Sequence, residues 1–120
     1  GDKMDNYTPS ATPITVLKGV DTIVGTGDTV KAGDTITADY VGALAATGQV
    51  FDASAKHGGP ISFPLSGVIA GWSQGIPGMK VGGARRLYIP ASLAYRTQGN
   101  QGIPANSDLV FDVTVTKIGK

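Results

Sequence analysis

The titratable side chains of this sequence are few and scattered. His57 is the only histidine, and neither a nucleophile nor an orienting acid lies beside it, as a catalytic base would require. We therefore expect His57 to be a solvated loop residue. The chain has no cysteine, and its carboxylates show no metal-ligand spacing. Its glycines form no phosphate-binding or dinucleotide loop, so we expect neither a metal nor a cofactor.

Aromatic residues with polar neighbours are the main remaining chemical feature. The only tryptophan, Trp72, stands between apolar residues and a glycine-rich stretch, which favours an indole presented at a surface rather than enclosed in a thick core. Tyr95 lies in residues 91–108, a stretch too long for a mere connection and typical of a functional loop. Asp52 follows Phe51 directly, which sets a carboxylate beside an apolar face. The pattern indicates an aromatic pocket, whereas Phe63 is interpreted as core.

Short strands and one helix must position these residues. Runs of β-branched and aromatic residues, several with alternating polarity, predict strands. The predicted strands cover residues 14–20, 35–44, 50–51, 61–65, 85–89 and 109–118. Only the segment from Val68 to about Gly75 is a helix candidate, and Gly71 and Pro77 keep it short. Because one short helix cannot cover a flat sheet of this many strands, we predict an α+β fold: a curled antiparallel sheet of five to six strands wrapped round one short helix.

Length and charge limit the possible partners. A chain of 120 residues is expected to form one domain. Residues 1–13 are polar, contain two prolines and lack apolar periodicity, so we expect a flexible lead-in followed by a domain at residues 14–120.

The net charge of +1, and the pair Arg85-Arg86 interpreted as a solvated strand start, indicate no nucleic-acid partner. No apolar run is long enough for direct membrane insertion. Cytoplasmic and tethered extracytoplasmic locations both stay open.

Short motifs follow one another from about residue 14 to residue 120. They are Ala32-Gly33-Asp34, Asp39-Tyr40-Val41-Gly42, Gly48-Gln49-Val50-Phe51-Asp52-Ala53-Ser54, Val68-Ile69-Ala70-Gly71-Trp72, Gly78-Met79-Lys80-Val81-Gly82-Gly83, Ile89-Pro90 with Leu93-Ala94-Tyr95, and Ile103-Pro104 with Leu109-Val110-Phe111-Asp112-Val113. In this order and spacing they resemble the FKBP peptidyl-prolyl isomerases, immunophilins that bind the macrolide tacrolimus. The resemblance implies a curled antiparallel sheet around one short helix, with the active site between the two.

The resemblance also implies a role for each of ten residues. Trp72 would be the floor of a proline-binding pocket, and Asp52 would accept a hydrogen bond at its edge. The backbone N–H of Ile69 and the hydroxyl of Tyr95 would hold substrate carbonyls, and Ile103 would close the loop side. The implied catalytic residues are Tyr40, Asp52, Trp72, Tyr95 and Phe111, and the implied substrate-binding residues are Phe51, Ile61, Val68, Ile69 and Ile103.

The implied activity is cis–trans isomerisation of X-Pro bonds in protein substrates, which assists folding. The resemblance implies a monomer that works without a cofactor or metal and that binds tacrolimus and rapamycin. Rotation of this bond needs no proton transfer. The implied rate is therefore nearly flat from about pH 6 to pH 8, with His57 dispensable.

Departures from the family pattern keep other functions open. Ile61 stands where an aromatic residue is frequent, His57 where a basic residue is expected, and Arg96 where glycine is usual; the segment before Val68 is also shorter. These differences leave a catalytically weak proline-peptide-binding or chaperone module, using the same pocket, as the alternative function. A purely structural β-domain is a third class.

Overall fold

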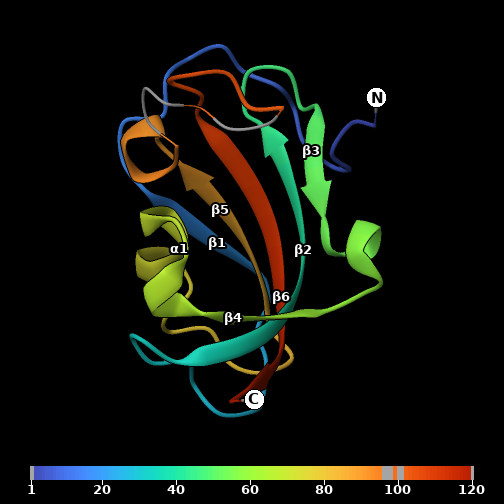
Figure 1. The fold of residues 1–120 in the computed structure, drawn as a ribbon, viewed down its shortest axis with the longest axis vertical. Coiled ribbons are helices and arrows are strands. Elements are labelled where there is room, and N and C mark those ends of the chain that lie inside the picture. Colours follow the sequence, from blue (N-terminus) through green and yellow to red (C-terminus); the bar gives the residue numbers. More distant parts are fainter. Residues whose placement is uncertain (1, 96–98, 100–101, 120) are drawn as a thin grey trace.

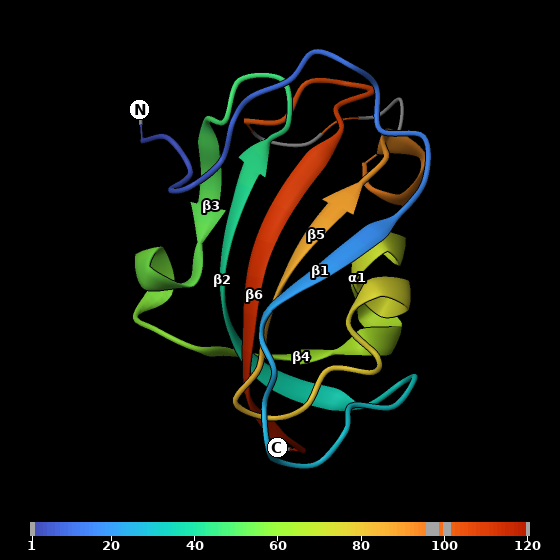
Figure 2. The same ribbon diagram turned by 180° about the vertical axis from the view of Figure 1, so that it is seen from behind.

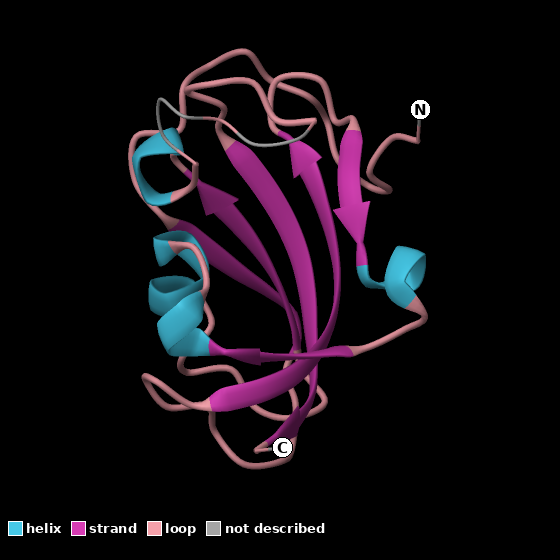
Figure 3. Ribbon diagram, viewed as in Figure 1, coloured by secondary structure: helices cyan, strands magenta, loops and turns pink. Residues whose placement is uncertain are grey.

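A computed structural model describes residues 2–95, 99 and 102–119 of the chain. Within them, an antiparallel sheet of six strands curls around one α-helix, as the sequence predicts (Figures 1 and 3). The strands are β1 (Lys18–Ile23), β2 (Thr35–Leu44), β3 (Val50–Ala53), β4 (Ile61–Pro64), β5 (Ala84–Ile89) and β6 (Leu109–Ile118), the α-helix is α1 (Ala70–Gly75), and the short 3-10 helices are η1 (Ser54–His57), η2 (Leu65–Gly67) and η3 (Ala91–Leu93). None of the helices in these residues is long and apolar enough to cross a membrane.

The long strand β2 organises the sheet, whose strand order is β1-β5-β6-β2-β3. One edge of β2 pairs with β6 along almost its whole length. Its other edge pairs first with β4 and then with β3. In Figure 1, β4 crosses the lower part of the sheet and leads into α1. This path brings the helix over one face of the sheet.

Two hydrophobic clusters occupy opposite faces of the sheet. Side chains alternate between faces along a strand. On β6, Phe111 and Val113 therefore join the main cluster with the α1 residue Trp72, whereas Val110 joins a smaller cluster with Met4. The main cluster fills the space between the sheet and α1. This is the face on which the helix can enclose a site.

Helix α1 is held close to β5. A Cβ atom at Gly71 would lie 2.5 Å from Cγ2 of Ile89, so only glycine permits this approach. At the other end of the helix, Arg85 Nη1 donates to the Gly75 carbonyl at 2.8 Å, while Arg85 Nε pairs with Asp21 at 2.6 Å. Arg85 thus satisfies a terminal carbonyl of the helix and links it to β1.

The pair Arg85-Arg86 is not the solvated strand start that the sequence suggests. The two side chains are only 16% and 12% exposed. Arg86 donates to both carboxylate oxygens of Asp112, at 2.6 and 2.7 Å, in the bidentate geometry that suits arginine. Asp112 lies opposite Arg86 on the neighbouring strand β6. Strand pairing supplies this partner, which local sequence does not reveal.

Strand β1 begins later than predicted. It runs from Lys18 to Ile23, paired with β5, instead of over residues 14–20. The N–H of Ile14 donates to the carboxylate of Asp108 at 2.8 Å and takes no part in the strand. All six residues of β1 are exposed, as fits an edge strand. Its bounds are set by pairing with β5 and not by its own apolar pattern.

Residues 2–13, expected to be a flexible lead-in, lie against the sheet; we call them the leading segment. In Figure 2 this segment passes the start of β3 and then runs over the top of the view toward β1. The N–H of Met4 donates to the Gly48 carbonyl at 2.8 Å, and the N–H of Val50 donates to the Asp2 carbonyl at 2.9 Å. Met4 is 5% exposed. The buried Met4 side chain and the backbone hydrogen bonds to Gly48 and Val50 hold the leading segment against the sheet, although its composition is that of a linker.

We expect Met4→Ala to lower the free energy of unfolding by about 2 kcal/mol, the low end for a buried methionine, because a terminal segment can undock without opening the main core. Urea denaturation measures this change. Val16→Ala is the matched control, since Val16 is 70% exposed and should change stability little. Equal stabilities of the two variants would contradict docking of the leading segment in solution.

Candidate functional site

A cavity of about 360 Å³ opens between α1 and the concave face of the sheet. Eight of the ten residues assigned to the site from the sequence line it, together with Phe63 and Gly67. The lining residues are Tyr40, Phe51, Asp52, Phe63, Gly67, Val68, Ile69, Trp72, Tyr95 and Phe111. They come from β2, β3, β4, β6, η2, α1 and the segments that follow η2 and η3, so the cavity forms only when the sheet has closed around the helix.

Trp72 is the centre of the aromatic lining. Its ring meets those of Tyr40, Phe63 and Phe111 edge to face, at centroid distances of 5.4, 5.1 and 5.2 Å. Only 4% of Trp72 is exposed, so the sequence-based expectation of a surface indole is wrong. The reason is that three rings from three different strands surround it. Trp72 is at once the floor of the cavity and part of the core.

The indole N–H of Trp72 is buried and has no hydrogen-bond partner in the described part of the chain. An unpaired buried donor costs about 1–3 kcal/mol. The aromatic packing around the ring must outweigh that cost. The floor of the cavity is therefore apolar in its contacts, although the ring carries a polar group.

Gly42 makes room for the far wall of the cavity. A Cβ atom there would lie 2.5 Å from Cε1 of Phe111 and 2.9 Å from Cζ of Phe51. Without it, these two phenylalanines pack edge to face with centroids 5.5 Å apart. The glycine in the motif Asp39-Tyr40-Val41-Gly42 is thus explained by packing of the pocket wall.

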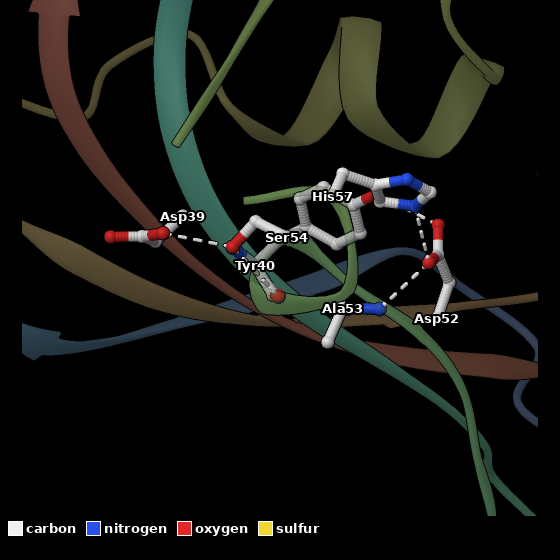
Figure 4. A network of polar contacts seen from close by, with 6 residues as sticks. All are labelled: Asp39, Tyr40, Asp52, Ala53, Ser54 and His57. Atoms are coloured by element: carbon white, nitrogen blue, oxygen red, sulfur yellow. Dashed lines mark hydrogen bonds and ion pairs between the residues drawn. The ribbon is translucent and has the colours of Figure 1, made fainter. Parts of the chain in front are cut away.

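Asp52 forms a polar network at the rim of the cavity (Figure 4). It accepts hydrogen bonds from the Tyr40 hydroxyl at 2.7 Å and from the Ala53 N–H at 2.9 Å. Burial acts to raise the pKa of Asp52, but the hydrogen bonds from Tyr40, His57 and Ala53 outweigh it and lower that pKa. Burial and the bond to Asp52 raise the pKa of Tyr40. Near neutral pH the rim therefore carries one carboxylate, and Tyr40 stays a neutral donor.

His57 is a member of this network and not merely the solvated loop residue expected from the sequence. Its Nε2 lies 2.9 Å from Oδ1 of Asp52, although 51% of the side chain is exposed. An ionised carboxylate only accepts hydrogen bonds, so Nε2 carries the hydrogen. The sequence alone does not reveal this contact, because a histidine five residues after an aspartate meets it only if the intervening chain turns back.

Ile69 lies where η2 passes into α1 and caps the start of the helix. Its carbonyl accepts the N–H groups of Trp72 and Ser73 at 2.9 and 3.1 Å. Its own N–H donates to no acceptor in the described residues, and Ile69 lines the cavity. Tyr95, which follows η3, lines the cavity as well. A free backbone donor and a phenol thus stand beside an apolar floor.

Two residues assigned to the site from the sequence lie outside the lining. Ile61 is partly buried and packs against the main cluster, two residues before Phe63 on β4. Ile103 is 5% exposed and belongs to the main core. Phe63, interpreted as core from the sequence, lines the cavity. Side chains alternate along a strand, so residues 61 and 63 lie on the same face of β4. This alternation is the sequence signal that favours placing Phe63 in the site together with Ile61. Arg96 lies outside the described residues.

The chain matches one protein family over most of its length. Residues 27–116 match the family of FKBP-type peptidyl-prolyl cis-trans isomerases. A protein of Gibberella zeae named FK506-binding protein 4 is 50% identical over 113 residues, which cover 90% of this chain and 22% of that protein. The chain thus spans about a fifth of the length of that curated relative.

Two solved structures have the same fold. The crystal structure of FkpA from Escherichia coli superposes with a TM-score of 0.80 at 40% identity, over 97% of this chain and 53% of that one. The structure titled AtFKBP13 gives a TM-score of 0.78 at 39% identity, over 86% of this chain and 93% of that one.

Proposed function

The chain belongs to the family of FKBP-type peptidyl-prolyl cis-trans isomerases, and on that premise we propose that it accelerates rotation about X-Pro bonds in peptide and protein substrates. The observation that carries the proposal is the cavity itself. Its floor and walls are aromatic, and its lining includes the carboxylate of Asp52, the phenols of Tyr40 and Tyr95, and Ile69, whose backbone N–H has no acceptor in the described residues. We therefore propose that the residues lining this cavity bind the substrate and carry out catalysis.

The reaction requires little chemistry from the protein. Rotation must overcome the loss of amide resonance, a barrier of about 18–20 kcal/mol, but no covalent bond breaks. A planar amide is more dipolar than a twisted one, so an apolar cavity disfavours the ground state relative to the transition state. The rings of Trp72 and Phe111 supply that environment around the prolyl ring.

Donors at the rim would orient the substrate. The free N–H of Ile69 and the hydroxyl of Tyr95 are suited to the carbonyls on either side of the rotating bond, and fixing both ends leaves a single torsion to change. Asp52 serves as a fixed acceptor in this scheme, because its low pKa and its partner Tyr40 keep it ionised.

The proposed partners are proline-containing peptides and proteins, together with the macrolides tacrolimus and rapamycin. The name of the Gibberella zeae relative refers to FK506, which is tacrolimus. We propose that this chain binds such ligands in the same cavity. A macrolide with a proline-like ring would occupy the aromatic floor.

The direct test is exchange spectroscopy of a short prolyl peptide together with refolding of a protein limited by proline isomerisation, neither of which needs a protease. We expect the slow refolding rate and the cis–trans exchange rate to rise in proportion to protein concentration. Peptide binding without faster exchange would instead assign a proline-peptide-binding module. Absence of both would overturn the proposed function.

A further inference from the structure

Asp108, directly before β6, joins two segments that lie far apart in the chain. Its Oδ2 accepts the Ile14 N–H at 2.8 Å, and its Oδ1 accepts the Ala91 N–H at 2.9 Å. The backbone of Asp108 is itself held, because its carbonyl accepts the Ala45 N–H at 2.9 Å. Each carboxylate oxygen thus has a backbone donor, and the side chain holds the two segments together at the end of the sheet.

Ala91 is the first residue of the 3-10 helix η3. The first N–H groups of a helix have no partner inside it, and the side chain of Pro90, which precedes η3, cannot accept one. Asp108 supplies that acceptor from another part of the chain. Within η3, the Leu93 N–H donates to the Pro90 carbonyl at 2.9 Å. Because so short a helix has little stability of its own, the contact at its first residue helps to fix where it lies.

Tyr95 depends on the position of this helix. It follows the last residue of η3, Leu93, by two residues and lines the cavity. Leu93, Ala94 and Tyr95 all pack partly buried against the main cluster. Figures 1 and 2 show η3, the orange turn, just above α1. A shift of η3 would therefore move the Tyr95 phenol relative to the cavity floor.

We propose that Asp108 is a positioning residue for catalysis: by accepting the Ala91 N–H it fixes η3, and η3 in turn sets the hydroxyl of Tyr95 against the substrate. The inference rests on the proposed isomerase function, in which that hydroxyl orients a substrate carbonyl. Asp108 is not among the residues that line the cavity. Its effect on the rate therefore has to pass through Tyr95.

A double-mutant cycle with Tyr95→Phe tests this path. Exchange spectroscopy of a prolyl peptide gives kcat/KM for the wild type, the two single variants and the double variant. Tyr95→Phe should lower kcat/KM about tenfold, since it removes one orienting hydrogen bond. Asp108→Ala should lower it about fivefold, because a displaced orienting group loses most of its effect. In the Tyr95→Phe background, the same Asp108→Ala substitution should change kcat/KM less than about twofold.

Asp34→Ala is the matched control for loss of a carboxylate that accepts a backbone N–H. Asp34 Oδ2 accepts the Lys31 N–H at 2.8 Å in the turn before β2. This variant should leave kcat/KM of the folded protein unchanged, whatever stability it loses in urea denaturation. If Asp108→Ala does not fold, the cycle is run with Asp108→Asn, which keeps the side-chain shape but whose NH₂ group cannot accept an N–H.

The cycle distinguishes positioning from a purely structural role. Equal losses on Asp108 substitution in both backgrounds would overturn the inference, as would no loss in the wild-type background or no loss in Tyr95→Phe alone. All three results leave the isomerase assignment intact, because the wild-type protein still accelerates exchange. A wild-type protein that does not accelerate exchange would refute the proposed function and this inference with it.

Discussion

Trp72→Leu is expected to lower the free energy of unfolding by roughly 3 kcal/mol and to reduce kcat/KM at least tenfold. The side chain is 4% exposed and makes three edge-to-face ring contacts. Truncating a buried large aromatic to alanine costs about 3–5 kcal/mol, and leucine recovers part of that volume. The lost ring contacts contribute about 0.5–1.5 kcal/mol each beyond area burial.

Stability and activity must be measured separately in this variant. Urea denaturation gives the change in stability, and exchange spectroscopy well below the melting temperature gives the change in activity of the folded protein. Trp72→Phe is the matched control: it keeps an aromatic floor and removes the buried N–H that lacks a partner. We expect it to lose less stability and less activity than Trp72→Leu. A Trp72→Leu protein as stable as the wild type would contradict the position of Trp72 in the core.

Tacrolimus should stabilise the folded protein by about 2.7 kcal/mol at a concentration one hundred times its Kd, because a ligand that binds only the folded state shifts unfolding by mass action. The structure contains an open cavity of about 360 Å³, and a preformed site lowers the ordering cost of binding. Thermal unfolding with increasing tacrolimus or rapamycin measures the shift, and calorimetry supplies Kd.

Phe51→Ala tests whether the drug occupies the cavity. Phe51 lines the cavity and packs against Phe111, so its removal should weaken binding and reduce the thermal shift at a given drug concentration. Val24→Ala, at a side chain that is 72% exposed, should keep the full shift. An equal shift in both variants would place the macrolide elsewhere on the protein, and no shift at tens of micromolar drug would contradict the proposed ligand.

Local sequence was sufficient for most of the fold. The bounds of β2 and β6 are those predicted, since alternation of apolar and polar residues over ten positions specifies both a strand and its buried face. The short helix followed from its glycines and from Pro77. The curled sheet then followed because so small a helix must be wrapped to be covered. Most of the cavity lining was likewise identified from short motifs whose order and spacing are specific to one family.

Burial and pairing were decided only by the tertiary structure. Whether Trp72 is exposed or buried depends on aromatic rings of β2, β4 and β6 that pack around it. The residues next to Trp72 in the sequence do not reveal these contacts. The pairing of Arg86 with Asp112 and the docking of Met4 beside Gly48 likewise join positions far apart in the chain. His57 and Asp52 are near in sequence, yet they meet only because Ser54 is anchored on β2 and the chain turns at Gly58. Strand patterns depend on a residue and its immediate neighbours, whereas the burial of a side chain and its charge partner depend on every element that packs around it.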